Sequence, residues 1–310
     1  MLYPLSYWGA DMIISRVAGP AKATGMGALA VTSTGLTLLS PGDRLKKRYE
    51  IIAVHHVSGL NTLYVARDVG RRGRERTVAI KESLLDDGLG LPPDEARKAF
   101  NARAKRLVKI KHPGIARTYD FFLDPEHSYL VTEFIEGQDL ESVLLSSEEP
   151  LSYPRVCTWG IAIAEALECL HSQKPDPIIY RDLKPSNIML ERGELVRLVD
   201  FGIADAFPHG VTLDPLGTDG YAAPEQYQGI VTPAIDIYAL GATLHHLLTS
   251  SDPRLEEPFS FDRRPIRALN PAVPETVCAV IERALSENPE QRYPNASAMG
   301  IALQTTLLNT

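Results

Sequence analysis

The sequence predicts an α+β fold in which strands dominate the first part of the chain and helices dominate the rest. Three short runs rich in apolar and β-branched residues, Tyr49–Val54, Leu63–Arg67 and Thr77–Lys81, have the length and composition of strands. Later in the chain, Arg155–Ser172 carries apolar side chains at helical spacing and is predicted to be a buried helix. Strands grouped ahead of helices are typical of an α+β fold.

Between these regions the sequence predicts one more helix and one hairpin. Pro93–Lys111 begins with proline, and Phe100 opens an apolar face at helical spacing, so this stretch is predicted to be a helix. Thr118–Leu123 and Ser128–Phe134 are apolar runs separated by the turn sequence Asp-Pro-Glu. They are predicted to pair as antiparallel strands.

The most informative stretch is Ile178–Leu190, which opens and closes with apolar runs that are predicted to be strands. The tight polar loop between them holds Asp182, Lys184 and Asn187. Pro185 fixes its own φ angle and biases the residue before it away from the helical region, so this loop should be stiff.

A second carboxylate follows ten residues after this stretch. Asp200 opens the tripeptide Asp-Phe-Gly and is preceded by another apolar run. The turn sequence Arg192-Gly193 lies between the two runs, so residues 188–199 are predicted to form a hairpin with a carboxylate at each mouth.

One chemistry fits these residues together. Phosphoryl transfer needs a carboxylate for the proton of the attacking hydroxyl, oxygen ligands for magnesium and a cation on the phosphates. Asp182 suits the first role, Asn187 and Asp200 suit the metal, and Lys184 suits the transferred phosphate. Asp-x-Lys-x-x-Asn followed by Asp-Phe-Gly resembles the catalytic loop and metal motif of eukaryotic-type (Hanks-type) serine/threonine protein kinases. Tyr-Arg-Asp-Leu-Lys-Pro-Ser-Asn (180–187) and Gly-Tyr-x-x-Pro-Glu-Gln-Tyr (220–227) most resemble the bacterial branch of that family.

This resemblance begins at about Pro41 and covers the rest of the chain. It implies a bilobal protein kinase fold over residues 41–308, with a small β-rich N-lobe (41–134) and a larger helical C-lobe (139–308) joined by a hinge (133–138). It also implies ATP and Mg²⁺ as cofactors, Ser/Thr-containing proteins as substrates, and a transient homodimer for autophosphorylation. The nucleotide would be bound by one lysine and by lid, strand and hinge residues: Lys81, Ser58, Gly59, Ala79, Glu133 and Ile135.

Two regions of the expected nucleotide site depart from the family pattern. The lid over the phosphates, between the first two strands, carries His56, Ser58 and Asn61 where the family has glycines, and only Gly59 is glycine. On the helix that should start at residue 93, Arg103 stands where the family places the glutamate that pairs with the strand lysine. Two cations near one site repel, so Lys81 is expected to turn towards Asp200 and the helix to swing outward.

These departures keep a second function open. A pseudokinase that binds nucleotide or acts as a scaffold is the alternative to an active kinase. The presence of Lys81, Asp182, Asn187 and Asp200 favours activity, because catalysis of this kind is mostly positioning and electrostatics. A small-molecule kinase is less favoured, since Gly217–Glu225 resembles the peptide-substrate platform of protein kinases.

The resemblance also implies three structural contacts in the C-lobe. Thr218 should hydrogen-bond to Asp182 and Lys184, and Asp236 should accept backbone amides of the polar loop. Arg292, in the sequence Asn-Pro-Glu-Gln-Arg, should form a buried ion pair with Glu225.

Composition and charge are those of an ordinary globular protein, with 44% apolar and 23% charged residues and a net charge of −7. The charge is uneven. Residues 44–117 hold 18 Lys and Arg against 8 Asp and Glu, whereas residues 118–310 hold 12 against 29. The basic block could face nucleic acid or an acidic partner, but its residues are scattered over strands and a helix. We therefore interpret it as a solvated lobe and expect no nucleic-acid partner.

Cysteine content and the N-terminal sequence bear on location. Cys157, Cys169 and Cys278 match no metal-ligand spacing, so free thiols in a reducing, cytoplasmic compartment are expected. Residues 1–40 are predicted to be a disordered extension, or to result from a misassigned start codon. Residues 23–40 are too polar to span a membrane, and residues 11–20 do not fit a signal peptide.

If phosphorylation of the segment after Asp200 switches activity, Thr212 is the best acceptor, because its phosphate could pair with Arg181 beside the catalytic aspartate. Mass spectrometry of the autophosphorylated protein checks this expectation. Phosphate absent from all of residues 203–221 would reject it.

Overall fold

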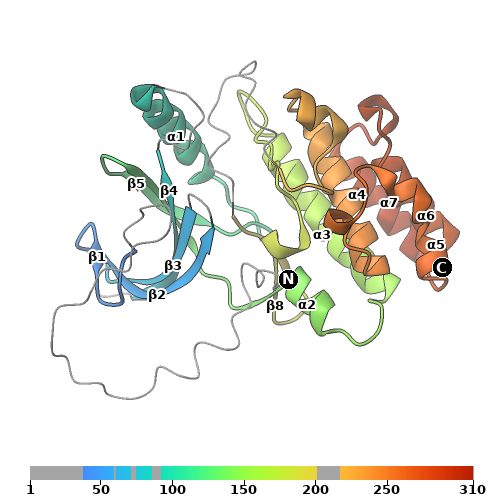
Figure 1. Cartoon of the computed structure of the whole chain (residues 1–310), viewed down its shortest axis with the longest axis horizontal. Coiled ribbons are helices and arrows are strands. Elements are labelled where there is room, and N and C mark those ends of the chain that lie inside the picture. The colour runs from blue at the N-terminus through green and yellow to red at the C-terminus, as the bar shows by residue number, and fades with distance from the viewer. Residues whose placement is uncertain (1–37, 59–60, 71–74, 86–91, 201–216, 310) are drawn as a thin grey trace.

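The computed structural model describes residues 38–58, 61–70, 75–85, 92–200 and 217–309. They form a strand-rich lobe and a helical lobe, which lie on opposite sides of Figure 1. The expectations for the N-terminal extension, for Gly59 and for Thr212 fall outside the described residues.

The first lobe is built on a six-stranded sheet in the order β1-β2-β3-β4-β6-β5, in which every pair is antiparallel. Its strands are β1 (Arg44–Leu45), β2 (Tyr49–Ser58), β3 (Asn61–Asp68), β4 (Arg76–Leu84), β5 (Thr118–Leu123) and β6 (His127–Glu133). The predicted strands and hairpin are confirmed. β2 and β3 are longer than predicted, and their pairing continues to Ser58 and Asn61. The segment expected to be a loop over the phosphates is therefore mostly a β-ladder.

Helix α1 (Pro93–Leu107) packs against β5. It buries Phe100, as predicted, but ends at Leu107, earlier than the predicted end at Lys111. Lys109 and Ile110 instead bond three residues back, to the carbonyls of Arg106 and Leu107, which tightens and closes the last turn. Pro113 follows shortly and disfavours further helix.

A second sheet joins the hinge to the predicted hairpin at residues 188–199. β7 (Gly137–Asp139) pairs with β8 (Ile188–Glu191), which pairs with β9 (Val196–Leu198). A Cβ atom on Gly137 would lie 2.1 Å from the Leu190 carbonyl oxygen, so only glycine allows this approach. The strand predicted at Ile178–Tyr180 is wrong. This stretch joins no sheet, because the amides of Tyr180 and Arg181 donate to the Asp236 side chain.

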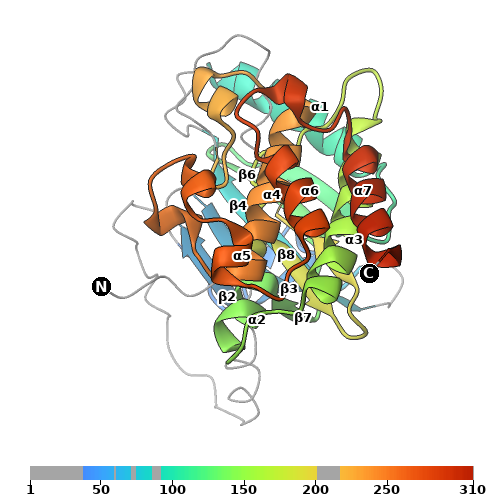
Figure 2. The same cartoon turned by 90° about the vertical axis from the view of Figure 1, so that its right-hand side faces the viewer.

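The second lobe is helical and packs around one long helix, α3 (Tyr153–His171). Its other helices are α2 (Leu140–Ser146), α4 (Pro233–Thr249), α5 (Ile266–Leu269), α6 (Glu275–Ala284) and α7 (Ala296–Leu308). Figure 2 shows α4, α6 and α7 side by side on this lobe. Gly160 of α3 lets Leu244 of α4 and Leu303 of α7 approach its backbone closely.

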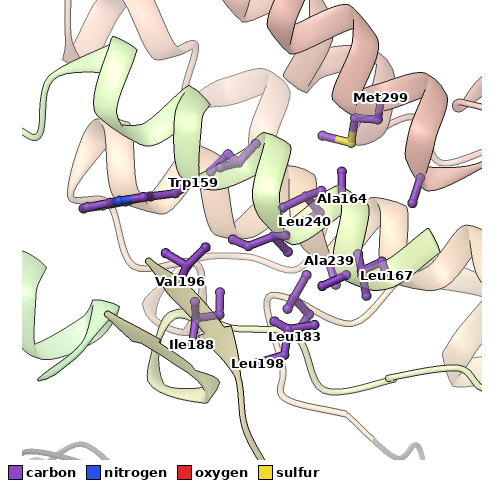
Figure 3. Close-up of a cluster of buried hydrophobic side chains, with 14 of the residues drawn as sticks. Trp159, Ala164, Leu167, Leu183, Ile188, Val196, Leu198, Ala239, Leu240 and Met299 are labelled. Carbon is purple, nitrogen blue, oxygen red and sulfur yellow. The ribbon is translucent and has the colours of Figure 1, made fainter. Parts of the chain in front are cut away.

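The core of this lobe also holds the hairpin. Leu183, Ile188 and Leu198 are almost fully buried and lie against α3 and α4 (Figure 3). The polar loop and Asp200 are therefore attached to the buried core of the helical lobe. All three cysteines are free, as expected; Cys157 and Cys278 are buried and Cys169 is partly so. Among the described residues, no helix combines the length and apolar character needed to cross a membrane.

The predicted ion pair between Arg292 and Glu225 is present and buried. Two Arg292 nitrogens donate to the two carboxylate oxygens at 2.5 and 2.8 Å, and the guanidinium also donates to the carbonyls of Ala234, Ser286 and Glu287. Arg292 thus ties the turn after the 217–223 segment to α4 and to the loop before α7.

Arg292→Ala should lower the free energy of unfolding by about 3–5 kcal/mol, because it leaves the Glu225 charge buried and alone. Denaturant unfolding followed by circular dichroism measures this loss. Arg263→Ala is the matched control, because the Arg263–Glu257 pair is mostly exposed and should contribute less than about 1 kcal/mol. Equal losses in the two variants would contradict the structural role of Arg292.

Candidate active site

The polar loop, residues 181–187, is positioned by one buried carboxylate. Asp236, in the first turn of α4, accepts hydrogen bonds of 2.8 Å from the backbone amides of Tyr180 and Arg181 and contacts His171 Nε2 at 2.8 Å. Asp236 is fully buried. The predicted role of Asp236 is confirmed. It sets the direction in which the chain enters the loop, and so the direction of Asp182.

Asp182 lies among three donors. Its carboxylate accepts from Thr218 Oγ1 at 2.6 Å and from Asn187 Nδ2 at 3.0 Å, and Lys184 Nζ lies 3.0 Å from it. Burial alone would raise the pKa of Asp182, but the charge of Lys184 and these hydrogen bonds outweigh it and hold the pKa below its usual range. The side chain is therefore an oriented, ionised carboxylate at neutral pH, as a proton acceptor must be.

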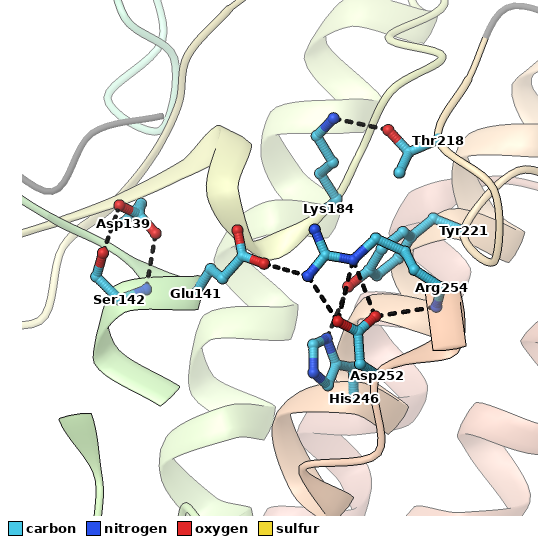
Figure 4. Close-up of polar contacts among 9 residues, drawn as sticks. All are labelled: Asp139, Glu141, Ser142, Lys184, Thr218, Tyr221, His246, Asp252 and Arg254. Atoms are coloured by element: carbon cyan, nitrogen blue, oxygen red, sulfur yellow. Dashed lines mark hydrogen bonds and ion pairs between the residues drawn. The ribbon is translucent and has the colours of Figure 1, made fainter. Parts of the chain in front are cut away.

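Thr218, which lies in the 217–223 segment, links Asp182 and Lys184. Lys184 Nζ donates to Thr218 Oγ1 at 2.6 Å (Figure 4), and the same hydroxyl donates to Asp182. The contacts predicted for Thr218 are confirmed. The 217–223 segment is thereby attached directly to the polar loop.

Asn187 leaves one oxygen available. Its Nδ2 donates to the backbone carbonyl of Asp182 at 2.8 Å, while its Oδ1 is buried and has no hydrogen-bond partner among the described residues. The backbone carbonyl of Asn187 accepts a hydrogen bond from the amide of Val199 at 3.1 Å, which brings the next residue, Asp200, beside Asn187. An amide oxygen without a partner beside a carboxylate is a donor set that suits a hard cation such as Mg²⁺.

Lys81 and Asp200 form an ion pair between Nζ and Oδ1, although 119 residues separate them. Both side chains are largely buried. The expectation that Lys81 turns towards Asp200 is confirmed.

Asp200 has φ = 54° and Arg181 has φ = 71°, a left-handed backbone that non-glycine residues rarely adopt. Such strain is concentrated at functional sites, because the surrounding structure must hold it.

One contact and one electrostatic interaction in the site were not predicted from sequence. The Tyr180 hydroxyl donates to the carbonyls of Val199 and Asn187, and so ties the polar loop to the residue before Asp200. Burial lowers the pKa of His56 on β2, and the charge of Asp200 opposes this shift, which places His56 near Asp200. A histidine in the expected lid could have suggested such an interaction, but nothing in the nearby sequence identifies Asp200 as the charge that acts on it.

Arg103 faces the polar loop from α1. Burial lowers its pKa to about 9, helped by the positive charges of Arg181 and Arg106 and opposed by Asp236. Burial likewise lowers the pKa of Arg181 to about 10. Arg181, which the sequence did not identify as a neighbour of Arg103, is therefore close enough to act on its charge.

The hinge side of the site is apolar. Leu63, Ala79, Ile135, Met189 and Val199 form one buried cluster with Ala116, and Phe134 packs against it. The backbone N–H and C=O of Ile135 have no hydrogen-bond partner among the described residues, although the residue is 1% exposed. Buried backbone groups without partners beside an apolar cluster fit the edge of a planar heterocycle.

Glu133 differs from Ile135 in this respect. Its amide already donates to the Arg117 carbonyl at 2.8 Å, and its carboxylate accepts from Arg197 at 2.6 Å. The structure thus brings Lys81, Asp182, Lys184, Asn187 and Asp200 to the end of the hairpin at which Ile188 pairs with Leu198. Ala79 and Ile135 lie in the apolar cluster beside it, and Ser58 lies at the end of β2.

Comparisons with known proteins agree with this geometry. The family model described as "Protein kinase domain" matches residues 66–301. The chain is 30% identical over 276 residues to serine/threonine-protein kinase PrkC of Bacillus subtilis, which covers 85% of this chain and 41% of PrkC. It is also 30% identical over 275 residues to PknB of Mycobacterium tuberculosis, covering 83% of this chain and 42% of PknB. The chain thus spans about two fifths of the length of these relatives.

Solved structures show the same fold. The kinase domain of Mycobacterium tuberculosis PknI superposes with a TM-score of 0.69 at 23% identity, covering 86% of this chain and 99% of that one. A structure titled "PpkA-294 apo form" gives a TM-score of 0.63 at 26% identity, covering 86% and 99%.

Proposed function

Because this chain belongs to the protein kinase domain family, we propose that it transfers the γ-phosphate of ATP to Ser and Thr hydroxyls of proteins, itself included. The observation that carries this proposal is the oriented carboxylate of Asp182, kept ionised by Lys184, Thr218 and Asn187. Names of similar proteins support the same activity, since PrkC and PknB are serine/threonine-protein kinases. A cytoplasmic location and a transient homodimer stay predictions.

In this mechanism Asp182 accepts the proton of the attacking hydroxyl. Lys184 lies beside it and would neutralise charge on the transferred phosphoryl group. Asn187 Oδ1 and the Asp200 carboxylate would hold Mg²⁺, which when bound neutralises phosphate charge. Two protein oxygens are enough, because Mg²⁺ usually completes its six ligands with water and phosphate.

Nucleotide binding requires an exchange at Lys81. In the structure its ammonium is paired with Asp200, so neither group is yet directed to its ligand. Lys81 would leave Asp200 to bind the phosphates, and Asp200 would then become available to the metal. Ile135 and the apolar cluster around Ala79 would hold the adenine. We therefore propose that the Lys81–Asp200 pair belongs to a resting arrangement of the enzyme.

Incubation of the full chain with labelled ATP, Mg²⁺ and a generic protein substrate tests the proposal. Label should enter the chain and the substrate. Asp182→Asn removes the proton acceptor while keeping its shape and should abolish transfer, whereas Asp262→Asn, at an exposed position, should not. Nucleotide binding with no transfer by the unmodified chain would overturn the proposal in favour of a pseudokinase.

Asp200→Ala should reduce metal-dependent transfer by at least about a hundredfold, because it removes a proposed magnesium ligand. Initial rates at several Mg²⁺ concentrations measure this loss, and circular dichroism confirms that the variant is folded. Asp262→Ala serves as control. Unchanged turnover in Asp200→Ala would remove Asp200 from the site.

Arg103→Glu should raise ATP turnover, by about tenfold at most, and Arg103→Ala should raise it less. The reason is that a carboxylate on this face of α1 would remove a buried positive charge and could compete with Asp200 for Lys81. The structure adds Arg181 as a rival partner for that carboxylate, which is why the gain should be modest.

Steady-state kinetics and nucleotide dissociation constants for both variants measure this effect. Lys105→Glu, an exposed reversal of the same charge on the same helix, should change neither. Weaker nucleotide binding in both Arg103 variants would show instead that Arg103 itself binds a phosphate.

A further inference from the structure

A charged cluster of three side chains lies beside the proposed site and takes no part in the mechanism above. It consists of Glu141 on α2 with Asp252 and Arg254 in the loop after α4, and we call it the 141/252/254 cluster. Figure 4 shows the Arg254 guanidinium between Glu141 and Asp252, with Lys184 and Thr218 in the same view. The cluster therefore brings together two parts of the chain that border the 217–223 segment.

The cluster is tied to that segment by direct backbone packing. Gly220, with φ = 85°, lies so close to Pro253 that a Cβ atom on it would be 2.5 Å from the Pro253 carbonyl. Two residues earlier, Thr218 donates to Asp182. Burial raises the pKa of Tyr221, and the charges of Asp252, Arg254, Glu141 and Asp182 also shift it. This one side chain therefore lies within electrostatic reach of the cluster and of the proposed proton acceptor.

The two halves of the cluster are held differently. Arg254 Nε contacts both carboxylate oxygens of Asp252, at 2.9 and 3.1 Å, and the Arg254 amide also donates to Asp252 at 2.9 Å. These contacts within one turn fix the guanidinium. Glu141, by contrast, reaches the guanidinium from another element through a single contact, from Arg254 Nη2 to its Oε1.

Glu141 keeps an acceptor available. Its second oxygen, Oε2, has no hydrogen-bond partner among the described residues, and Figure 4 draws only one contact to this side chain. Arg254 likewise has no described partner for Nη1, and its side chain is 36% exposed. A ligand at this cluster could therefore hydrogen-bond either to the Glu141 carboxylate or to the Arg254 guanidinium. The net charge of the cluster decides which kind of ligand is favoured.

That charge is negative. Glu141 and Asp252 carry two negative charges, and Arg254 carries one positive charge. The adjacent buried groups add none at neutral pH. Burial lowers the pKa of His246 to about 4 and raises the pKa of Tyr221, so both stay neutral and share a 2.7 Å hydrogen bond. A bound cation would bring the cluster to neutrality, whereas a bound carboxylate would set three anions around one guanidinium.

We infer that the 141/252/254 cluster selects substrate peptides with a basic side chain, Arg or Lys, near the phosphorylated residue, and that Glu141 Oε2 accepts the hydrogen bond from it. The inference rests on the proposed function and names its substrate class. The excess of acidic over basic residues in 118–310, 29 against 12, would attract the same peptides over longer range. Glu141 binds the substrate, and Arg254 and Asp252 position Glu141.

Binding of labelled peptides to the full chain, followed by fluorescence anisotropy, tests the inference independently of catalysis. The peptides share a central serine in an Ala/Gly background and carry a single Arg, Glu or Ala at each flanking position in turn. Arg at one or two positions should bind about tenfold tighter than Ala, as expected for a hydrogen bond between charged groups, and Glu should bind no tighter than Ala. Glu141→Gln should remove the preference for Arg.

Two variants control for general charge. Glu148→Gln, just after α2, and Asp219→Asn, an exposed carboxylate in the 217–223 segment, should both keep the preference. Loss of the preference in Asp219→Asn but not in Glu141→Gln would overturn the assignment to Glu141. Equal binding of Arg and Ala peptides, or tighter binding of Glu peptides, would overturn the inference.

Phosphorylation of the same peptides, measured in parallel, separates this inference from the proposed function. Selective binding without phosphate transfer to any peptide would reject the proposed kinase activity and leave the peptide site standing. Transfer to all peptides at equal kcat/KM, with equal affinities, would reject the peptide site and leave the kinase activity standing.

Discussion

The site depends on the buried carboxylate of Asp236. This side chain lies in the first turn of α4, accepts the amides of Tyr180 and Arg181, and contacts His171 of α3. It replaces the sheet hydrogen bonds that these amides would otherwise need, so the chain can enter the polar loop without a strand. Because α4 is almost entirely buried, the position of Asp182 is fixed by the centre of the helical lobe.

Motifs with local structure could be predicted from the sequence. Asp182, Lys184, Asn187 and Asp200 lie on a turn and a hairpin whose residues are close in sequence, so spacing alone places them together. Contacts between distant segments, such as Thr218 with Asp182, required the family resemblance. The strand predicted at Ile178–Tyr180 failed because a side-chain acceptor, Asp236, competes with a neighbouring strand for the same amides, and no periodicity reveals that competition.

Other features could not be predicted because they depend on which face of an element meets another. Arg103 was expected to act on Lys81 from its place in a motif, but nothing in the sequence indicated that Arg181 also lies near it. The charge of Arg181 adds to burial in lowering the pKa of Arg103. Glu141 and Arg254 are 113 residues apart, on a helix and a loop with no distinctive sequence. The long pairing of β2 with β3 was missed because the residues that replace glycine in the lid also allow a continuous ladder.

The ion pair between Lys81 and Asp200 has a consequence for the order in which ligands bind. Each group neutralises the other, so a phosphate must draw Lys81 from Asp200, and a metal ion must draw Asp200 from Lys81. The ligand that binds first must supply the free energy needed to separate Lys81 from Asp200. The ligand that binds second finds its own side chain already unpaired. Nucleotide and metal are then thermodynamically linked: each raises the affinity for the other by the same factor, even where they do not touch.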